Sequence, residues 1–235
     1  MEKLNSTKYN LNIFKNPQVI ISDENNITLE IQNELIVDSE FLNTLIEEIK
    51  NLHPKFKKML KDKDMKFFVG YKFSDFFIEQ RINDNYGYAI DFDKESRGIM
   101  TDDVNRIILL YKNLRIENIG AILYHELGHF IDAYDKFGDI DSVYDLTYSS
   151  REELIKAYKN DFIKHYSLIK NDDNPYLRHF VQDNTPEKFR QTSISETFAE
   201  LFRLTFNKIN NTKTVELYFP ESSVIVKKMV DSIIN

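Results

Sequence analysis

The chain has 235 residues, of which 42% are hydrophobic, and it includes 18 Phe and 13 Tyr. This length and content predict a folded protein with a sizeable core and exclude a disordered chain. The formal net charge of −7 provides no basic surface, so we expect no nucleic-acid partner. Cysteine is absent, which excludes disulfides and thiolate ligands and leaves His, Asp and Glu to hold any metal.

Targeting signals are not apparent in the sequence. No apolar run approaches the roughly 20 residues that a membrane-spanning helix needs, so we expect a soluble protein without a membrane span. The first residues, MEKLNSTKYNLNIFKNP, lack an apolar core of signal-peptide length. This pattern leaves both a cytoplasmic and an exported protein open.

The first quarter of the chain combines short apolar pieces with one clear helix. Apolar pieces among Asn and Asp residues predict strands or an irregular arm over residues 9–35. A helix is expected from Asp38, capped by Ser39 and ended by Pro54. Its apolar residues recur at helical spacing: Phe41, Leu42, Leu45, Ile46, Ile49 and Leu52.

Strands are predicted next, and helices dominate the second half. The predicted strands are MKFFVGY (65–71), YGYAIDF (86–92) and RIILLY (106–111). Helical spacing then extends over about 118–134, 150–170, 187–208 and, after Pro220, 221–234. Because strands come first and helices later, we predict the α+β class.

Two histidines lie four residues apart in YHELGHFID (124–132), inside the first of these long helices. Residues at i and i+4 share one face of a helix, so His125 and His129 can point at one ion. They would supply two of the three protein ligands of a catalytic zinc. Glu126 lies about 100° around the helix from His125, within reach of a water on that ion, and is the candidate general base. The alternative is two surface or core histidines without a metal.

The third ligand separates the families of zinc enzymes. The extended pattern HExxHxxGxxH would need Gly at 132 and His at 135, whereas the chain has Asp132 and Asp135, which excludes a metzincin. The segment SISETFAELFRL (193–204) places Glu196 and Glu200 on one face of a later helix. One carboxylate would bind the metal, and the other would accept a hydrogen bond from a ligand imidazole. A solvated helix face is the alternative.

Other candidate ligands lack a metal-site pattern. His53, His165 and His179 are interpreted as solvated or capping side chains. The acidic segment 132–145 lacks the ligand spacing and the glycine of an EF-hand, so we interpret it as a solvated loop.

The pair HELGHFIDAY and SETFAELFR, in this order, resembles the catalytic domain of anthrax lethal factor and the related Pro-Pro endopeptidases, which are gluzincin-type zinc metallopeptidases. The resemblance covers roughly residues 105–235. It implies a zincin-like fold, with a small mixed sheet packed on the HExxH active-site helix and a helical C-terminal part. We therefore expect a catalytic domain over residues 61–235, preceded by an arm and a helix of uncertain role over residues 1–60.

The resemblance also implies roles for individual residues. By motif position, His125, His129 and Glu196 would bind zinc, and Glu126 would be the general base. Glu200 and Asp132 match two further acidic positions of the family and would support the ligands from behind. The implied function is hydrolysis of peptide bonds in a protein substrate by a bacterial toxin, effector or secreted protease.

Phe189 departs from the family pattern. The family places a tyrosine seven residues before its ligand glutamate, where the hydroxyl helps to stabilise the oxyanion, and this position is Phe189. Loss of one oxyanion donor typically costs about 100- to 1000-fold in turnover. Three explanations stay open: a donor from elsewhere, with Tyr176, His179 or Arg190 as candidates, a weakened or non-catalytic relative, or an engineered replacement of a natural tyrosine.

Two other functions remain open from the sequence. An intracellular HExxH protease that cleaves a regulator would carry the same HELGH motif, although we find no DNA-binding helix-turn-helix of the kind that usually accompanies it. A zinc-binding module that docks a partner without catalysis would explain Phe189.

Overall fold

The computed structural model describes residues 16–22, 27–75, 96–101, 105–136, 148–172, 177, 184–207 and 213–235. The predicted strand 86–92, most of the acidic segment, Tyr176 and His179 lie outside these described residues. The chain forms two compact units, Met1–Ile122 and Leu123–Asn235. The division at residue 60 between an N-terminal part and a catalytic domain stays a prediction.

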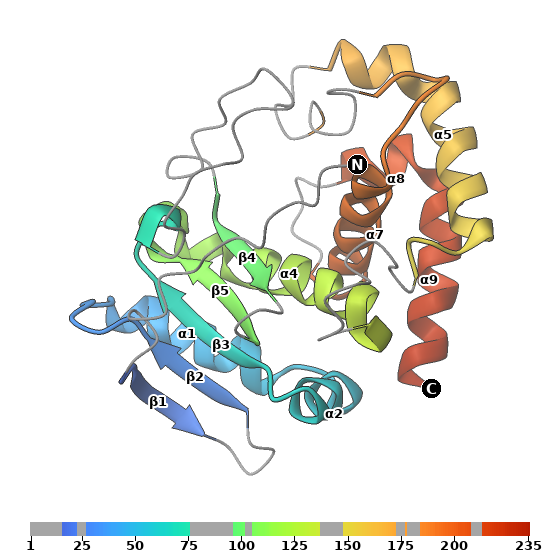
Figure 1. Cartoon of the computed structure of the whole chain (residues 1–235). Coiled ribbons are helices and arrows are strands. Elements are labelled where there is room, and N and C mark those ends of the chain that lie inside the picture. Colours follow the sequence, from blue (N-terminus) through green and yellow to red (C-terminus); the bar gives the residue numbers. More distant parts are fainter. Residues whose placement is uncertain are drawn as a thin grey trace, which may run out of the picture. The chain divides into compact units, whose positions relative to one another are not determined.

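The first unit contains a five-stranded mixed sheet in the order β1-β2-β3-β5-β4 (Figure 1). Its strands are β1 (Gln18–Ser22), β2 (Thr28–Ile31), β3 (Lys66–Gly70), β4 (Gly98–Thr101) and β5 (Arg106–Leu110). Strands β2, β3 and β5 are parallel, whereas β1 and β4 are antiparallel to their neighbours at the two edges. The predicted strands at 65–71 and 106–111 are confirmed. Strand β4 was missed because four residues are too few to show an alternating pattern.

The central strands are buried almost throughout. All residues of β3 and β5 after the first of each strand are buried. Parallel strands covered on both faces carry continuous apolar runs, which is the pattern of KFFVG and RIILL. The described part of this unit also contains a buried ion pair, in which Glu30 of β2 accepts from Nε of Arg106 at 2.9 Å and lies 2.8 Å from its Nη2.

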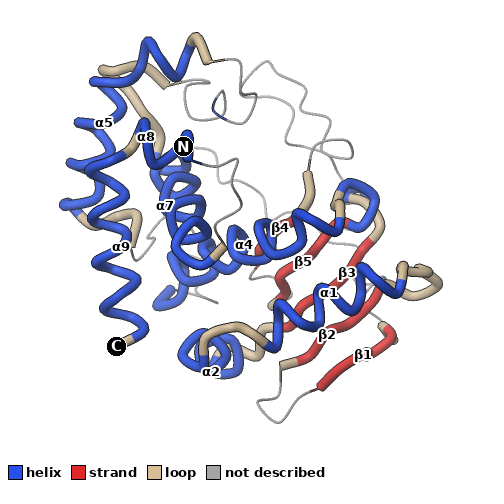
Figure 2. Tube along the Cα trace, turned by 180° about the vertical axis from the view of Figure 1, so that it is seen from behind, coloured by secondary structure: helices blue, strands red, loops and turns tan. Residues whose placement is uncertain are grey.

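Helix α1 (Ser39–Lys50) lies on one face of the sheet (Figure 2) and buries Phe41, Leu45 and Ile49. The expectation that Ser39 caps this helix is wrong. Asp38 is the cap, because its carboxylate accepts from the backbone N–H groups of residues 40 and 41 at 2.8 and 3.3 Å. A carboxylate one residue earlier therefore satisfies the free N–H groups of the first turn, and Ser39 becomes the first helical residue.

Pro54 does more than end a helix. It is the first residue of α2 (Pro54–Asp62), which the sequence reasoning did not predict. Proline suits this position because its fixed backbone angle fits the helix and its missing N–H is not needed there. The Nδ1 atom of His53 accepts from the backbone N–H of Lys55 at 3.2 Å, so the interpretation of His53 as a capping side chain is confirmed. The described residues of this unit also include three short 3-10 helices: η1 (Phe73–Asp75), η2 (Tyr111–Asn113) and η3 (Ile116–Asn118).

Helix α4 (Ile119–Ala133) begins in the first unit and continues in the second, where η4 (Tyr134–Lys136) follows it. This is the helix predicted over 118–134. Apolar side chains of α4 are buried on several sides: Ile119, Leu123, Leu127, Phe130 and Ile131. This burial holds α4 as a rigid support for the polar residues between them.

The second unit is helical in its described part. It contains α5 (Glu152–Lys170), α7 (Gln191–Phe206), α8 (Lys213–Tyr218) and α9 (Pro220–Ile234), and α9 packs against both α5 and α7 (Figure 1). The three long helices match the predictions, whereas six-residue α8 was missed. The buried carboxylate of Asp161 accepts from the backbone N–H of Ser222 at 2.8 Å and from its hydroxyl at 2.9 Å, which fixes the start of α9 on α5.

None of the described helices is long and apolar enough for a membrane crossing. The five-stranded sheet with its accompanying helices agrees with the α+β prediction.

Candidate metal centre

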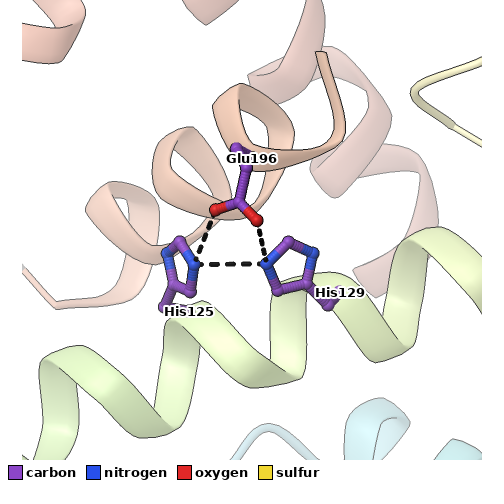
Figure 3. Close-up of side chains that lie close together, drawn as sticks. All are labelled: His125, His129 and Glu196. Atoms are coloured by element: carbon purple, nitrogen blue, oxygen red, sulfur yellow. Dashed lines mark hydrogen bonds and ion pairs between the residues drawn. The ribbon is translucent and has the colours of Figure 1, made fainter. Parts of the chain in front are cut away.

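Two imidazoles from α4 and one carboxylate from α7 converge within the second unit (Figure 3). The Nε2 atoms of His125 and His129 lie 3.2 Å apart. The Glu196 oxygens lie 3.3 Å from Nε2 of His125 and 3.5 Å from Nε2 of His129. Among the described residues, these three form the group of His, Asp and Glu side chains that could hold a metal ion.

The spacing of these atoms suits zinc. Zinc bonds of about 2.1 Å to nitrogen and oxygen place the ligand atoms of a tetrahedral site roughly 3.4 Å apart. The three separations, 3.2, 3.3 and 3.5 Å, lie close to this value, with Oε2 of Glu196 facing His125 and Oε1 facing His129. Taking one ligand atom from each residue, all three atoms lie within 4.8 Å of one another. Two imidazole nitrogens and a carboxylate oxygen are also donors that zinc prefers. The residues present therefore fit a zinc ion with three protein ligands.

Opposite charges stabilise the cluster in its metal-free form. Burial lowers the pKa of His125, but hydrogen bonds with Glu196 and Glu200 outweigh it, and the pKa lies well above its usual value. Although 49% of the Glu196 side chain is exposed, its carboxylate faces the two largely buried imidazoles, and this desolvation raises its pKa. The charge of His129 and the hydrogen bonds from both imidazoles outweigh this effect, and the pKa of Glu196 lies well below its usual value. Binding of a cation must therefore displace a proton from the imidazoles.

The carboxylate of Glu126 influences the two candidate ligand histidines. It is almost fully buried next to His125 on α4. Burial lowers the pKa of His125 and of His129, and the contacts with Glu196 raise both. The negative charge of Glu126 also raises both pKa values, by a smaller amount. A carboxylate that acts electrostatically on both candidate ligands is placed to receive a proton from a water near them. Its role as general base stays a prediction.

The other face of His125 meets a buried carboxylate. The Nδ1 atom of His125 lies 3.3 Å from Oε2 of Glu200. Arg203 donates to this oxygen from Nε at 2.8 Å and to Oε1 from Nη2. Burial raises the pKa of Glu200, but the hydrogen bonds from His125 and Arg203 outweigh it and lower the pKa to about 2. Glu196 and Glu200 thus contact opposite nitrogens of one imidazole, whereas their roles as ligand and support stay predictions.

Close packing brings the two helices together beside these residues. Gly128 of α4 faces the backbone of Ala199 of α7, so closely that a Cβ at position 128 would meet the Ala199 Cα at 2.8 Å. Any larger residue at 128 would push the helices apart. The glycine in HELGH thus permits the approach that lets Glu196 reach both imidazoles.

Asp132, predicted to support the ligands, is fully buried at the C-terminal end of α4. Its Oδ1 accepts from the backbone N–H groups of Tyr148 and Ser149 at 3.0 and 2.7 Å. Its Oδ2 accepts from the hydroxyl of Ser195 at 2.9 Å. Asp132 thus connects α4 to the residue before Glu196, and these bonds go to α7 and to the segment before α5 rather than to an imidazole.

Phe189 lies just before α7 and is half-buried. Its ring packs on Tyr158 of α5, with the ring centroids 5.4 Å apart. Tyr158 is fully buried, so its hydroxyl does not reach solvent. Of the three donor candidates named from the sequence, Arg190 is described, and its backbone N–H donates to Asn184 at 2.8 Å.

Arg203 and Ser195 were not identified from the sequence. Arg203 follows Glu200 by one helical turn, and this i, i+3 spacing of opposite charges was the available signal. Ser195 carries no such signal, because its partner Asp132 is 63 residues away in the chain. Only the packing of α7 on α4 brings that pair together.

A cavity of about 540 Å³ lies elsewhere, in the first unit. It is lined mainly by aromatic, aliphatic and charged side chains, including Tyr71, Tyr111, Leu114 and Lys112. It contains no histidine, and its two acids, Asp38 and Glu117, are not part of a metal cluster. The chemistry therefore points to the His125 cluster and not to this cavity.

No protein-family model and no curated protein matches this chain. Among solved structures, the chain is similar to the Pro-Pro endopeptidase (PPEP-2) from Paenibacillus alvei. The sequence identity is 12%, the match covers 86% of this chain and 96% of that chain, and the TM-score is 0.48. The chemistry of the site therefore has to be argued from the residues of this chain.

Proposed function

We propose that the protein is a zinc-dependent endopeptidase that hydrolyses peptide bonds of a protein substrate. One observation carries the proposal: His125, His129 and Glu196 converge with separations of 3.2–3.5 Å, close to those of a zinc site, beside the carboxylate of Glu126. A structural zinc site would be closed by a fourth protein ligand, whereas a catalytic site keeps one position open. Three protein ligands favour the catalytic kind.

The exposure of the ligands supports the same conclusion. The Glu196 side chain is 49% exposed, whereas those of His125 and His129 are 13% and 17% exposed. Water and a peptide can therefore approach from the side of Glu196. On the other side of His125, Glu200 is 5% exposed and keeps the imidazole in a fixed orientation.

The reaction would proceed with the chain's own groups in defined roles. A bound zinc ion would polarise the scissile carbonyl and lower the pKa of water to roughly 7. Glu126 would take a proton from the attacking water as the new C–O bond forms. The same carboxyl would give this proton to the amide nitrogen as the C–N bond breaks, so that the carboxylate is regenerated. His125, His129 and Glu196 would hold their positions throughout.

The kind of substrate is supported by the sequence motifs. The order of HELGHFIDAY and SETFAELFR resembles anthrax lethal factor and the Pro-Pro endopeptidases. We therefore propose a protein or peptide substrate and a role as a bacterial toxin, effector or secreted protease.

A second function follows from Phe189. If its missing hydroxyl is not replaced, the same three ligands would make a zinc-binding module with weak or no catalysis. The packing of Phe189 against the buried ring of Tyr158 favours a structural role for this position.

Metal analysis combined with cleavage of a randomised peptide library tests the proposal. We expect one zinc ion per chain in protein purified without chelator, and cleavage that is lost in Glu126→Ala while zinc binding is kept. Glu126→Gln is the matched variant, because it keeps the size of the side chain and removes only the base. It should lose cleavage and keep zinc binding as Glu126→Ala does.

The outcomes separate the two functions. A wild-type protein that contains no metal and does not bind added zinc contradicts both. Zinc binding without cleavage of any library peptide favours the module. Cleavage that persists in Glu126→Ala means that another group is the base.

A further inference from the structure

Arg203 makes an unusually complete set of contacts for a residue that does not touch the ligand group. Its side chain is 3% exposed, and the partner carboxylate of Glu200 is 5% exposed. Nε and Nη2 of Arg203 donate to the two oxygens of Glu200 as a fork. Nη1 lies 3.4 Å from the carbonyl oxygen of Asn207 at the end of α7. The guanidinium is thus fixed at both ends within its own helix.

This fork determines which way the Glu200 carboxylate faces. Its plane is set by two nearly parallel N–H···O bonds, a geometry that the guanidinium provides and an ammonium does not. Oε2 of Glu200 accepts a hydrogen bond from Nε of Arg203. The same oxygen lies 3.3 Å from Nδ1 of His125. A carboxylate without the fork would be free to turn about its last side-chain bonds, and the contact with His125 would weaken.

The contact with Nδ1 in turn determines the state of the imidazole. When Nδ1 carries its proton toward Glu200, the lone pair of the neutral ring is on Nε2. Nε2 is the atom that faces His129 and Glu196. Glu200 therefore directs the metal-binding lone pair, and it can do so only while its own orientation is kept.

We infer that Arg203 is a positioning residue: it holds the Glu200 carboxylate so that this group accepts from Nδ1 of His125 and leaves Nε2 of His125 directed at the metal position. The effect of Arg203 on zinc binding rests on the proposed function. Its effect on the Nδ1 proton of His125 rests on the hydrogen bonds alone. It adds one residue, on α7, to the groups that determine metal affinity.

A purely structural role would look different, and the chain offers a matched control. Arg106 also pairs with a buried glutamate in the sheet of the first unit: its Nε and Nη2 lie 2.9 and 2.8 Å from the same oxygen, Oε2, of Glu30. Loss of either arginine removes a close counter-charge from a buried carboxylate, which destabilises a fold, although Lys66 still lies 3.5 Å from Oε1 of Glu30. Only loss of Arg203 should change His125 and zinc binding.

The experiment compares Arg203→Met, Arg203→Lys, Glu200→Gln and Arg106→Met with the wild type. Zinc affinity is measured by competition with a chromophoric chelator. In the metal-free protein, NMR measures how well the Nδ1 proton of His125 is protected from exchange with water. Arg203→Lys keeps the positive charge but cannot form the fork. If Arg203→Met alone fails to fold, the double variant Glu200→Gln/Arg203→Met takes its place, because it leaves no buried unpaired charge.

We expect both Arg203 variants to lose protection of the Nδ1 proton and to bind zinc about 10- to 100-fold more weakly, as for other groups that orient metal ligands. Arg106→Met should lose stability and keep both properties. The pair Glu200→Gln/Arg203→Met should bind zinc as Glu200→Gln does, because Arg203 acts through Glu200.

Four results would overturn the inference. The first two are wild-type zinc affinity in both Arg203 variants and a protected Nδ1 proton of His125 in both. The other two are an equal loss of zinc affinity and of proton protection in Arg106→Met, and a zinc affinity of the double variant that is lowered by the sum of the two single effects. A wild-type protein that binds no zinc contradicts the proposed function instead, and protection of the Nδ1 proton then decides the role of Arg203 by itself.

Discussion

Gly128 of α4 and Ala199 of α7 are in contact through their backbones, and a Cβ on Gly128 would lie 2.8 Å from the Cα, 3.1 Å from the carbonyl oxygen and 3.2 Å from the Cβ of Ala199. Ala199 lies between Glu196 and Glu200 in the sequence, so the approach at this point also determines how far both carboxylates reach toward His125. Metal affinity should therefore be sensitive to a single methyl group.

Gly128→Ala tests this relationship. Alanine is the better helix former by about 1 kcal/mol, so an isolated helix would gain stability. In this contact we expect the opposite, a loss of about 1–3 kcal/mol in the free energy of unfolding because the helices must separate. Zinc affinity should fall as well, since Glu196 moves away from the imidazoles. Urea unfolding of the metal-free protein and chelator competition measure the two effects.

A second substitution is the control for this prediction. Ala199→Gly removes a Cβ but leaves the Cα and the carbonyl oxygen that the new methyl group would meet. The double variant should therefore stay impaired in zinc binding. Full recovery in the double variant would show that the Ala199 side chain, and not its backbone, limits the approach.

Glu196→Ala should abolish tight zinc binding. The carboxylate supplies one of three donors, and loss of a ligand should cost more than the roughly 10- to 100-fold that supporting groups cost. Chelator competition measures the affinity. Glu221→Ala, an exposed glutamate at the start of α9, is the control and should bind zinc as the wild type does. Wild-type affinity in Glu196→Ala would mean that another group is the third ligand.

The free energy of unfolding of the metal-free protein should fall at low pH, when the carboxylate of Glu200 takes up a proton. Its pKa in the folded protein is about 2, against an ordinary value of 4.5. The folded state thus keeps this carboxylate ionised where the unfolded chain binds a proton. The stabilisation is fully present above about pH 4.5 and is lost as the pH falls toward about 2.

Unfolding free energies of the wild type and Glu200→Gln, measured with urea at a series of pH values, isolate this effect because every other carboxyl group is shared. We expect the advantage of the wild type over the variant to shrink by on the order of 3 kcal/mol across this range. Parallel curves for the two proteins would show that Glu200 titrates normally.

Phe189→Tyr should raise turnover if the position serves the oxyanion in this chain. An added donor there would increase kcat by up to about 100- to 1000-fold without changing zinc affinity. Steady-state cleavage of the best library peptide measures it, and Phe189→Leu controls for the loss of the ring that packs on Tyr158. Unchanged turnover in Phe189→Tyr would mean that the donor comes from elsewhere or that the position only fills space.

Much of the candidate site was predictable because its parts are local. The i, i+4 spacing of His125 and His129 is a property of one helix, and so is the shared face of Glu196 and Glu200. The central strands β3 and β5 were predictable for the same reason, since their apolar runs are continuous. Short elements escaped: four residues of β4 and six of α8 carry too little pattern, and in α2 the proline that starts the helix was interpreted as the end of α1.

The sequence by itself thus determined which side chains share a helical face and which donors a metal would find, because both depend on residues a few positions apart. Tertiary structure alone decided that α7 meets α4 at Gly128 and Ala199, that the two carboxylates contact opposite nitrogens of His125, and that Asp132 reaches Ser195. These relationships join residues more than 60 positions apart. They follow from how close two helix backbones come to each other, which no periodicity within either helix can express.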